Sequence, residues 1–164
     1  NAINWLDGID GLAGGYCGLL SIGLFLIMFS QGNICGILCF SIILGTLIGF
    51  LIRNFRPAFY IMGDCGSNFL GYFFSASSIF FLPNPINGSI EIIYLLIIFS
   101  LPLGDMSLVI SERFINNKNI FLPDKNHIHH KLMNLNIRYS NIILILFSYS
   151  ALSISVGIFY LLNI

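Results

Sequence analysis

Residues 34–52 read ICGILCFSIILGTLIGFLI, an unbroken apolar run that contains no charged side chain and ends at Arg53. A helix needs about 20 mostly apolar residues to cross the hydrocarbon core of a membrane. The run is too long for a typical strand, and it lacks the alternation of polar and apolar residues that marks a membrane barrel. It therefore predicts a helix that spans a membrane.

Four more stretches share this apolar character. They are residues 12–30, 67–82, 90 to about 110, and 141–162. The whole chain is 57% hydrophobic and only 9% charged, whereas about a quarter of the residues of a soluble domain are charged. So few charges cannot cover a water-facing surface. We therefore predict an all-α fold: a polytopic transmembrane helix bundle with about five spanning helices, forming a single integral-membrane domain over residues 1–164.

The basic residues indicate how this bundle is oriented. All seven lysines and arginines fall in two of the loops between the apolar stretches: Arg53, Arg56, Arg113, Lys118, Lys125, Lys131 and Arg138. With five spans of alternating direction, both loops lie on the same side of the membrane, and basic residues mark the cytoplasmic side. The segment with Asp7 and Asp10, and the turn with Asp64, then also face the cytoplasm.

The N-terminal segment NAINWLDGIDG, residues 1–11, is the first candidate site. Asp7 and Asp10 are three residues apart and would share one face of a helix. Carboxylate oxygens suit Mg²⁺, which commonly completes its coordination with water and phosphate oxygens. The alternative is a polar turn in which Asp10 caps the next helix. An EF-hand loop is excluded, because Gly18 stands where the bidentate Glu would be.

The turn MGDCGSN, residues 62–68, is the second candidate. Asp64 and Ser67 can cap the following helix, or Asp64 can hold a metal bound to phosphate. Arg53 and Arg56 precede the turn, and the planar donor fork of arginine suits phosphate. Both arginines can equally anchor the end of the helix among lipid headgroups.

The third candidate is the segment PDKNHIHHK, residues 123–131, which holds the only histidines of the chain: His127, His129 and His130. Imidazole binds transition metals, but no Cys, Asp or Glu lies at a familiar zinc spacing. The flanking Lys125 and Lys131 favour an anionic ligand such as a diphosphate, and a solvated loop is the alternative.

Asp105 is the remaining unusual residue, because it falls inside the expected fourth span. Charge in that setting is costly, and such residues are commonly functional. A structural role in a polar contact between helices is the interpretation we favour for Asp105.

Together, the stretches NAINWLDGIDGLAGG, MGDCGSNFLG, PLGDM and PDKNHIHH resemble, in this order, the motifs of the polyprenyl-phosphate N-acetylhexosamine-1-phosphate transferase family. The resemblance implies an Mg²⁺-dependent enzyme (Mn²⁺ is a possible substitute) on the cytoplasmic face of the bacterial inner membrane. Such an enzyme transfers a sugar-1-phosphate from a UDP-sugar to undecaprenyl phosphate for cell-envelope polysaccharide synthesis, and releases UMP.

By motif match, the resemblance also implies roles for individual residues. Asp7, Asp10 and Asp64 would be catalytic, with Asp64 the principal metal ligand and Asp7 a second one. Asn4 would line the nucleotide site. The three histidines, His127, His129 and His130, would bind the diphosphate of the donor, and Arg53 and Arg56 are added as phosphate-binding candidates.

The form of the histidine motif resembles the branch that uses UDP-N-acetylglucosamine. Transfer of phospho-N-acetylmuramoyl-pentapeptide, or of another amino sugar, is the alternative within the family, and an ion- or metal-coupled transporter is the alternative outside it. Family members carry a further aspartate pair upstream, so we expect this chain to be the C-terminal part of a larger protein and inactive by itself. We expect membrane lipid as a partner and no nucleic acid, and a homodimer is possible.

Overall fold

The computed structural model describes residues 1–81, 89–117, 119 and 127–162. These residues form α-helices and no β-strand, which confirms the predicted all-α class. The helices are α1 (Ala2–Leu6), α2 (Leu12–Ser30), α3 (Ile34–Asn54), α4 (Gly63–Phe81), α5 (Ser89–Ile98), α6 (Ser100–Ile115), α7 (Ile128–Asn134) and α8 (Tyr139–Leu162).

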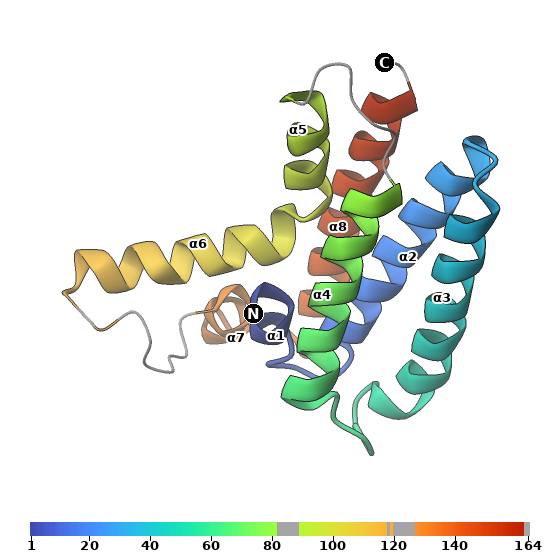
Figure 1. Ribbon diagram of the computed structural model, residues 1–164. Coiled ribbons are helices and arrows are strands. Elements are labelled where there is room, and N and C mark those ends of the chain that lie inside the picture. The colour runs from blue at the N-terminus through green and yellow to red at the C-terminus, as the bar shows by residue number, and fades with distance from the viewer. Residues whose placement is uncertain (82–88, 118, 120–126, 163–164) are drawn as a thin grey trace.

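The long helices α2, α3, α4 and α8 run side by side as a bundle (Figure 1). Helix α6 extends away from this bundle, and the short helices α1 and α7 lie between α6 and the lower half of the bundle. Helix α2 lies at the centre. Its most apolar window is 72% buried, against 17% for α3 and 28% for α8. Helices that are apolar all round but exposed in this way require an apolar surrounding. The exposed faces of α3 and α8 therefore suit lipid.

The number of spanning helices differs from the prediction. Among the described residues three helices, α2, α3 and α8, are long and apolar enough to cross a membrane, rather than about five. Helix α4 has a sufficient length, but Asp64, Asn68 and several serines lower its hydropathy. The predicted span over residues 90–110 is not one helix, because α5 ends at Ile98 and α6 starts in a new direction (Figure 1).

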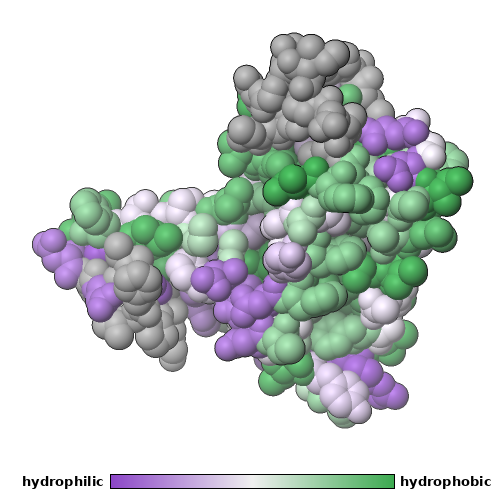
Figure 2. Space-filling view, viewed as in Figure 1, coloured by the Kyte–Doolittle hydropathy of each residue, from purple (hydrophilic) through white to green (hydrophobic). Residues whose placement is uncertain are grey.

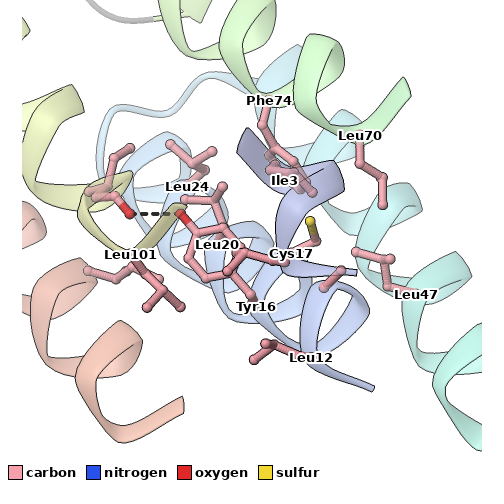
Figure 3. Close-up of a cluster of buried hydrophobic side chains, with 14 of the residues drawn as sticks. Ile3, Leu12, Tyr16, Cys17, Leu20, Leu24, Leu47, Leu70, Phe74 and Leu101 are labelled. Carbon is pink, nitrogen blue, oxygen red and sulfur yellow. Dashed lines mark hydrogen bonds between the residues drawn. The ribbon is translucent and has the colours of Figure 1, made fainter. Parts of the chain in front are cut away.

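Pro102 explains this break. Proline has no backbone N–H, so the carbonyl four residues earlier loses its helical partner. That carbonyl belongs to Ile98, and the Tyr16 hydroxyl donates a hydrogen bond to it at 3.0 Å (Figure 3). Tyr16, a buried residue of α2, thus supplies the hydrogen bond that the Ile98 carbonyl lacks. The chain can therefore change direction here, and α6, which carries Asp105, turns away from the bundle.

Helix α1 fixes the acidic N-terminal segment against the bundle. Ile3 and Leu6, one helical turn apart, are 3% and 2% exposed. Ile3 lies beside Phe74 of α4 in the buried cluster (Figure 3). Because the apolar face of α1 is anchored in this way, its polar residues are held at the start of α4.

Candidate active site

Asn4 joins the two acidic motifs. Its side-chain Nδ2 donates hydrogen bonds to Asp64 Oδ1 and to Ser67 Oγ, both at 2.9 Å. Asn4 and Asp64 are 60 residues apart in the sequence. The amide hydrogens fix the direction of the Asp64 carboxylate, and Ser67 also donates to the Gly63 carbonyl at 2.8 Å. The predicted grouping of Asn4 with Asp64 is therefore present in the structure.

Asp7 reaches the same turn from the other side. Its Oδ2 accepts a hydrogen bond from the Gly63 amide at 3.1 Å. Gly63 has a φ of 66°, a left-handed conformation that glycine adopts without the steric cost a side chain brings. The pKa of Asp7 is raised to about 6, chiefly by burial and to a smaller extent by the Asp64 and Asp10 carboxylates, while the hydrogen bond from the Gly63 amide acts in the opposite direction. Burial is the main cause of this shift, and the two neighbouring carboxylates add negative charge that a cation would offset.

Asp10 has a different setting from Asp7. Its Oδ2 accepts from the Ala58 amide at 3.3 Å, and its backbone carbonyl accepts from the Tyr139 hydroxyl. These contacts tie the segment after α3 and the start of α8 to the acidic segment. A catalytic role for Asp10 stays a prediction, and its observed contacts are architectural.

Asn54 is a residue that the motifs did not single out. It is 3% exposed, accepts from the Gly11 amide at 3.0 Å and donates to the Tyr60 carbonyl at 2.8 Å. It thereby holds the acidic segment and the turn before Asp64 in one register. The sequence signal for Asn54 was its position between Arg53 and Arg56, directly after a long apolar run.

The two arginines after α3 lie against aromatic rings. The Arg53 guanidinium is 5.8 Å from the centre of the Phe59 ring, and that of Arg56 is 4.6 Å from the centre of the Tyr139 ring. Arg56 also lines a pocket of about 590 Å³ together with Arg138 and Ser140. These contacts favour the anchoring interpretation of the two arginines, and their phosphate-binding role stays a prediction.

The three histidines form one cluster around the start of α7. The rings of His127 and His129 are parallel, with centres 5.6 Å apart, and the centre of the His130 ring is 4.4 Å from that of His129. The preceding residues 123–126, which carry Asp124 and Lys125 of the predicted motif, lie outside the described residues.

His129 connects this cluster to the acidic segment. A Cβ added to Gly8 would overlap with His129 Nε2 and lie 2.6 Å from Cε1, so the ring packs directly on the glycine between Asp7 and Asp10. His129 is 1% exposed, and neither ring nitrogen has a hydrogen-bond partner among the described residues. Burial, followed by the charge of His130, lowers the pKa of His129 to about 4. His129 is therefore neutral at physiological pH.

Trp5 adds a second connection between the same parts. Its ring meets that of His127 edge to face at 5.4 Å, and the Arg113 guanidinium lies 5.5 Å from its centre. Polar surface accordingly gathers where α1 and α7 lie, at the side of the bundle where the arm formed by α6 leaves it, while the bundle surface in this view is mostly hydrophobic (Figures 1 and 2). The structure thus unites the first and third predicted segments as well as the first and second.

The oxygen ligands at this place suit a hard cation. Within the described part of the chain, no three His, Cys, Asp or Glu side chains are grouped closely enough to hold a metal by themselves. Mg²⁺ requires no such cage, because it is commonly held by one or two carboxylates together with water and substrate phosphates. Asp64, oriented by Asn4, and Asp7, which contacts the same turn through the Gly63 amide, fit that requirement.

Comparison with known proteins extends these observations. The sequence profile of glycosyl transferase family 4 matches residues 1–82, which is half of the chain. A probable undecaprenyl-phosphate N-acetylglucosaminyl 1-phosphate transferase of Bacillus subtilis is 36% identical over 90% of this chain and 41% of its own length. The corresponding alpha-N-acetylglucosaminyl enzyme of Escherichia coli K12 is 31% identical over 96% of this chain and 44% of its own length.

A phospho-N-acetylmuramoyl-pentapeptide-transferase of Levilactobacillus brevis is also similar, at 32% identity over 80% of this chain and 39% of its own length. The chain therefore spans about two fifths of the length of these relatives. The profile covers both acidic motifs, and the relatives extend the similarity over most of the remaining sequence. The chain belongs to glycosyl transferase family 4.

Proposed function

We propose that the full-length protein transfers N-acetylglucosamine-1-phosphate from its UDP-sugar to undecaprenyl phosphate, releasing UMP and forming a lipid-linked diphosphate sugar for cell-envelope polysaccharide synthesis. The observation that carries the proposal is the bond from Asn4 to Asp64, which joins two acidic motifs beside a histidine cluster. The names of the relatives from Bacillus subtilis and Escherichia coli support this reaction.

In this proposal an oxygen of the lipid phosphate attacks the phosphorus that bears the sugar. A new phosphorus–oxygen bond forms, the bond between the two donor phosphates breaks, and UMP leaves with the bonding electrons. Asp64 and Asp7 would hold Mg²⁺ (or Mn²⁺), which neutralises charge as the anions approach one another. Asn4 keeps the Asp64 carboxylate directed, and the histidines face the donor diphosphate.

The surroundings of the site suit one lipid substrate and one soluble substrate. An apolar pocket of about 290 Å³ lies between α1, α4, α5 and α6, lined by residues that include Ile3, Leu95 and Phe99. A polyprenyl chain can lie there while its phosphate reaches the acidic segment. The nucleotide sugar then arrives from the cytoplasm, the side on which the basic residues are predicted to lie.

The second candidate is transfer of phospho-N-acetylmuramoyl-pentapeptide, which the similarity to the Levilactobacillus brevis enzyme supports. Ile128, which separates His127 from His129, favours the N-acetylglucosamine branch by resemblance. A transporter gains no support, because α2 and α8 contain no charged residue and Asp105 lies on α6, outside the three candidate spans.

The direct test uses the full-length protein in membranes, with undecaprenyl phosphate and labelled donor. We expect labelled lipid and UMP with UDP-N-acetylglucosamine, loss of both products with a chelator, and recovery with Mg²⁺. UDP-N-acetylmuramoyl-pentapeptide is the parallel donor, and product from this donor alone would assign the second branch. Absence of product from every UDP-sugar in active membranes would refute the transferase proposal.

Asp64→Asn is the sharpest variant for this reaction. The amide keeps the shape of the side chain but loses the charge that a cation needs, so we expect turnover to fall by about 10²–10³-fold with unchanged membrane insertion. The neighbouring Cys65→Ser is the matched control, because Cys65 is exposed and carries no role in the site. Unchanged turnover in Asp64→Asn would remove Asp64 from the site.

A further inference from the structure

Asp105 is buried, with 1% of its surface exposed, and both of its carboxylate oxygens engage the histidine segment. Oδ1 accepts a hydrogen bond from the Ile128 amide at 2.6 Å, and Oδ2 lies 2.8 Å from His127 Nδ1. A carboxylate removed from water must be compensated by hydrogen bonds or an opposite charge. Here the compensation comes from two adjacent residues of a predicted substrate-binding motif.

The two contacts constrain His127 in different ways. His127 is the N-cap residue of α7, and its own side chain makes no capping bond. Asp105 supplies the missing acceptor from α6 by taking the first amide of α7. The second oxygen then fixes the rotation of the His127 ring, which lies edge to face with Trp5 and parallel to His129.

The same geometry sets the position of the ring proton. A carboxylate accepts hydrogen bonds, so Nδ1 must carry hydrogen when it bonds to Asp105. The neutral ring then has its lone pair on Nε2, and the protonated ring has an N–H there. In either state Nε2 is the atom left to act on a ligand, as when a second residue orients a metal-bound or catalytic histidine.

We propose that Asp105 is a positioning residue for phosphoryl transfer: it holds His127 with Nδ1 protonated and directs Nε2 to the diphosphate of the nucleotide sugar. This inference rests on the proposed function. It goes beyond the expectation that Asp105 has a structural role in a polar contact between helices, because the partners of Asp105 belong to the histidine motif.

The chain contains a matched control for simple docking of α7. Glu112 on the same helix forms an ion pair with Lys131 of α7, with side chains 37% and 40% exposed. This pair also links α6 to α7, but it is separate from the bonds that Asp105 makes to His127 and Ile128. Glu112→Gln therefore weakens the link between the helices without altering the His127 proton, whereas a change at Asp105 affects both.

The test compares Asp105→Asn with Glu112→Gln in the full-length protein. In Asp105→Asn the carbonyl oxygen of the new amide can still accept from Ile128, so α7 keeps its cap, but the amide nitrogen faces His127 Nδ1. The ring must then accept at Nδ1 and carry its proton on Nε2. We expect kcat to fall by about 10²-fold or more, with KM for the donor changed less than about threefold, while Glu112→Gln stays near the wild-type rate.

A spectroscopic measurement makes the result independent of turnover. Nitrogen NMR of protein labelled at histidine distinguishes the two tautomers, and His127→Gln assigns the signal. We expect Nδ1–H in the wild type and in Glu112→Gln, and Nε2–H in Asp105→Asn. A tautomer that does not change in Asp105→Asn, or equal losses of activity in the two variants, would overturn the inference. The expected tautomers without any transferase activity would instead refute the proposed function alone.

Discussion

At the scale of single residues, Gly8 allows the acidic segment and the histidine cluster to touch. In Gly8→Ala the new methyl group would overlap with the His129 ring, and the neighbouring rings of His127 and His130 limit how far that ring can move. We expect a loss of about 1–3 kcal/mol in stability, as for other overpacked sites, and a larger loss of turnover. Gly45→Ala is the control, since a Cβ added at Gly45 would have no neighbouring atom within 4 Å. Thermal unfolding in detergent measures both variants, and equal stability would contradict the close contact.

The lowered pKa of His129 makes the stability of the folded chain depend on pH. Its pKa is lowered from 6.5 to about 4 in the folded chain, so between these values the unfolded chain binds a proton that the folded chain does not. Stability must therefore fall as the pH drops from about 6.5 to 4. Asp7, with its pKa raised to about 6, acts in the opposite direction below that pH.

His129→Asn removes the histidine contribution and leaves that of Asp7. We expect the fall in the unfolding temperature between pH 6.5 and 4 to be smaller in this variant than in the wild type. The measurement is a series of melting curves across that range, with Cys65→Ser, a change at an exposed residue, as the control. An identical pH profile in His129→Asn would show that His129 is not held neutral by burial.

Residue types and spacing placed the polar segments on one face of the membrane and left the role of each segment open. The resemblance of the motifs to a family implied one common site, and the bond from Asn4 to Asp64 and the packing of His129 on Gly8 bring these segments together. The roles of Asn54, Trp5 and Asp105 could not be predicted, because each depends on a partner brought near by folding. A buried asparagine or tryptophan has no distinctive sequence pattern until its neighbours are known.

At the scale of helices, the bond between Tyr16 and Ile98 stabilises the break between α5 and α6. Tyr16→Phe removes the hydroxyl and leaves a buried carbonyl without a partner, which costs about 1–3 kcal/mol. We expect a lower unfolding temperature and reduced turnover, since α6 carries Asp105. Tyr72→Phe on α4 is the control, because Tyr72 is 76% exposed. A Tyr16→Phe protein as stable as the wild type would show that the carbonyl finds another donor.

The break illustrates which elements the sequence could predict. The runs that became α2, α3 and α8 are long and continuously apolar, so length alone identified them. Residues 90–110 have a similar average composition, and Pro102 was the available signal that the helix changes direction. Proline is tolerated in some spanning helices, so Pro102 alone does not predict a break. The hydrogen bond from Tyr16 to the Ile98 carbonyl, which supports the break, is visible only in the folded structure.

At the scale of the whole molecule, the basic residues predict that the site faces the cytoplasm, and two natural cysteines allow a test. Cys65 lies in the first turn of α4 beside Asp64, and Cys35 lies at the opposite end of the bundle, in the first turn of α3. Both are exposed, whereas Cys17 is buried. If α3 crosses the membrane once, the two thiols must lie on opposite sides of it.

A membrane-impermeant maleimide reports this arrangement in the full-length protein. In intact spheroplasts we expect labelling that Cys35→Ser removes and Cys65→Ser leaves unchanged, and after permeabilisation an additional signal that Cys65→Ser removes. The physical reason is that the reagent cannot cross the hydrocarbon core to the face where Asp7 and Asp64 lie. If Cys65 reacted in intact spheroplasts, the site would face outward, where UDP-sugars of the cytoplasm cannot reach it. That result would refute the proposed donor as well as the orientation, because both depend on the same side of the membrane.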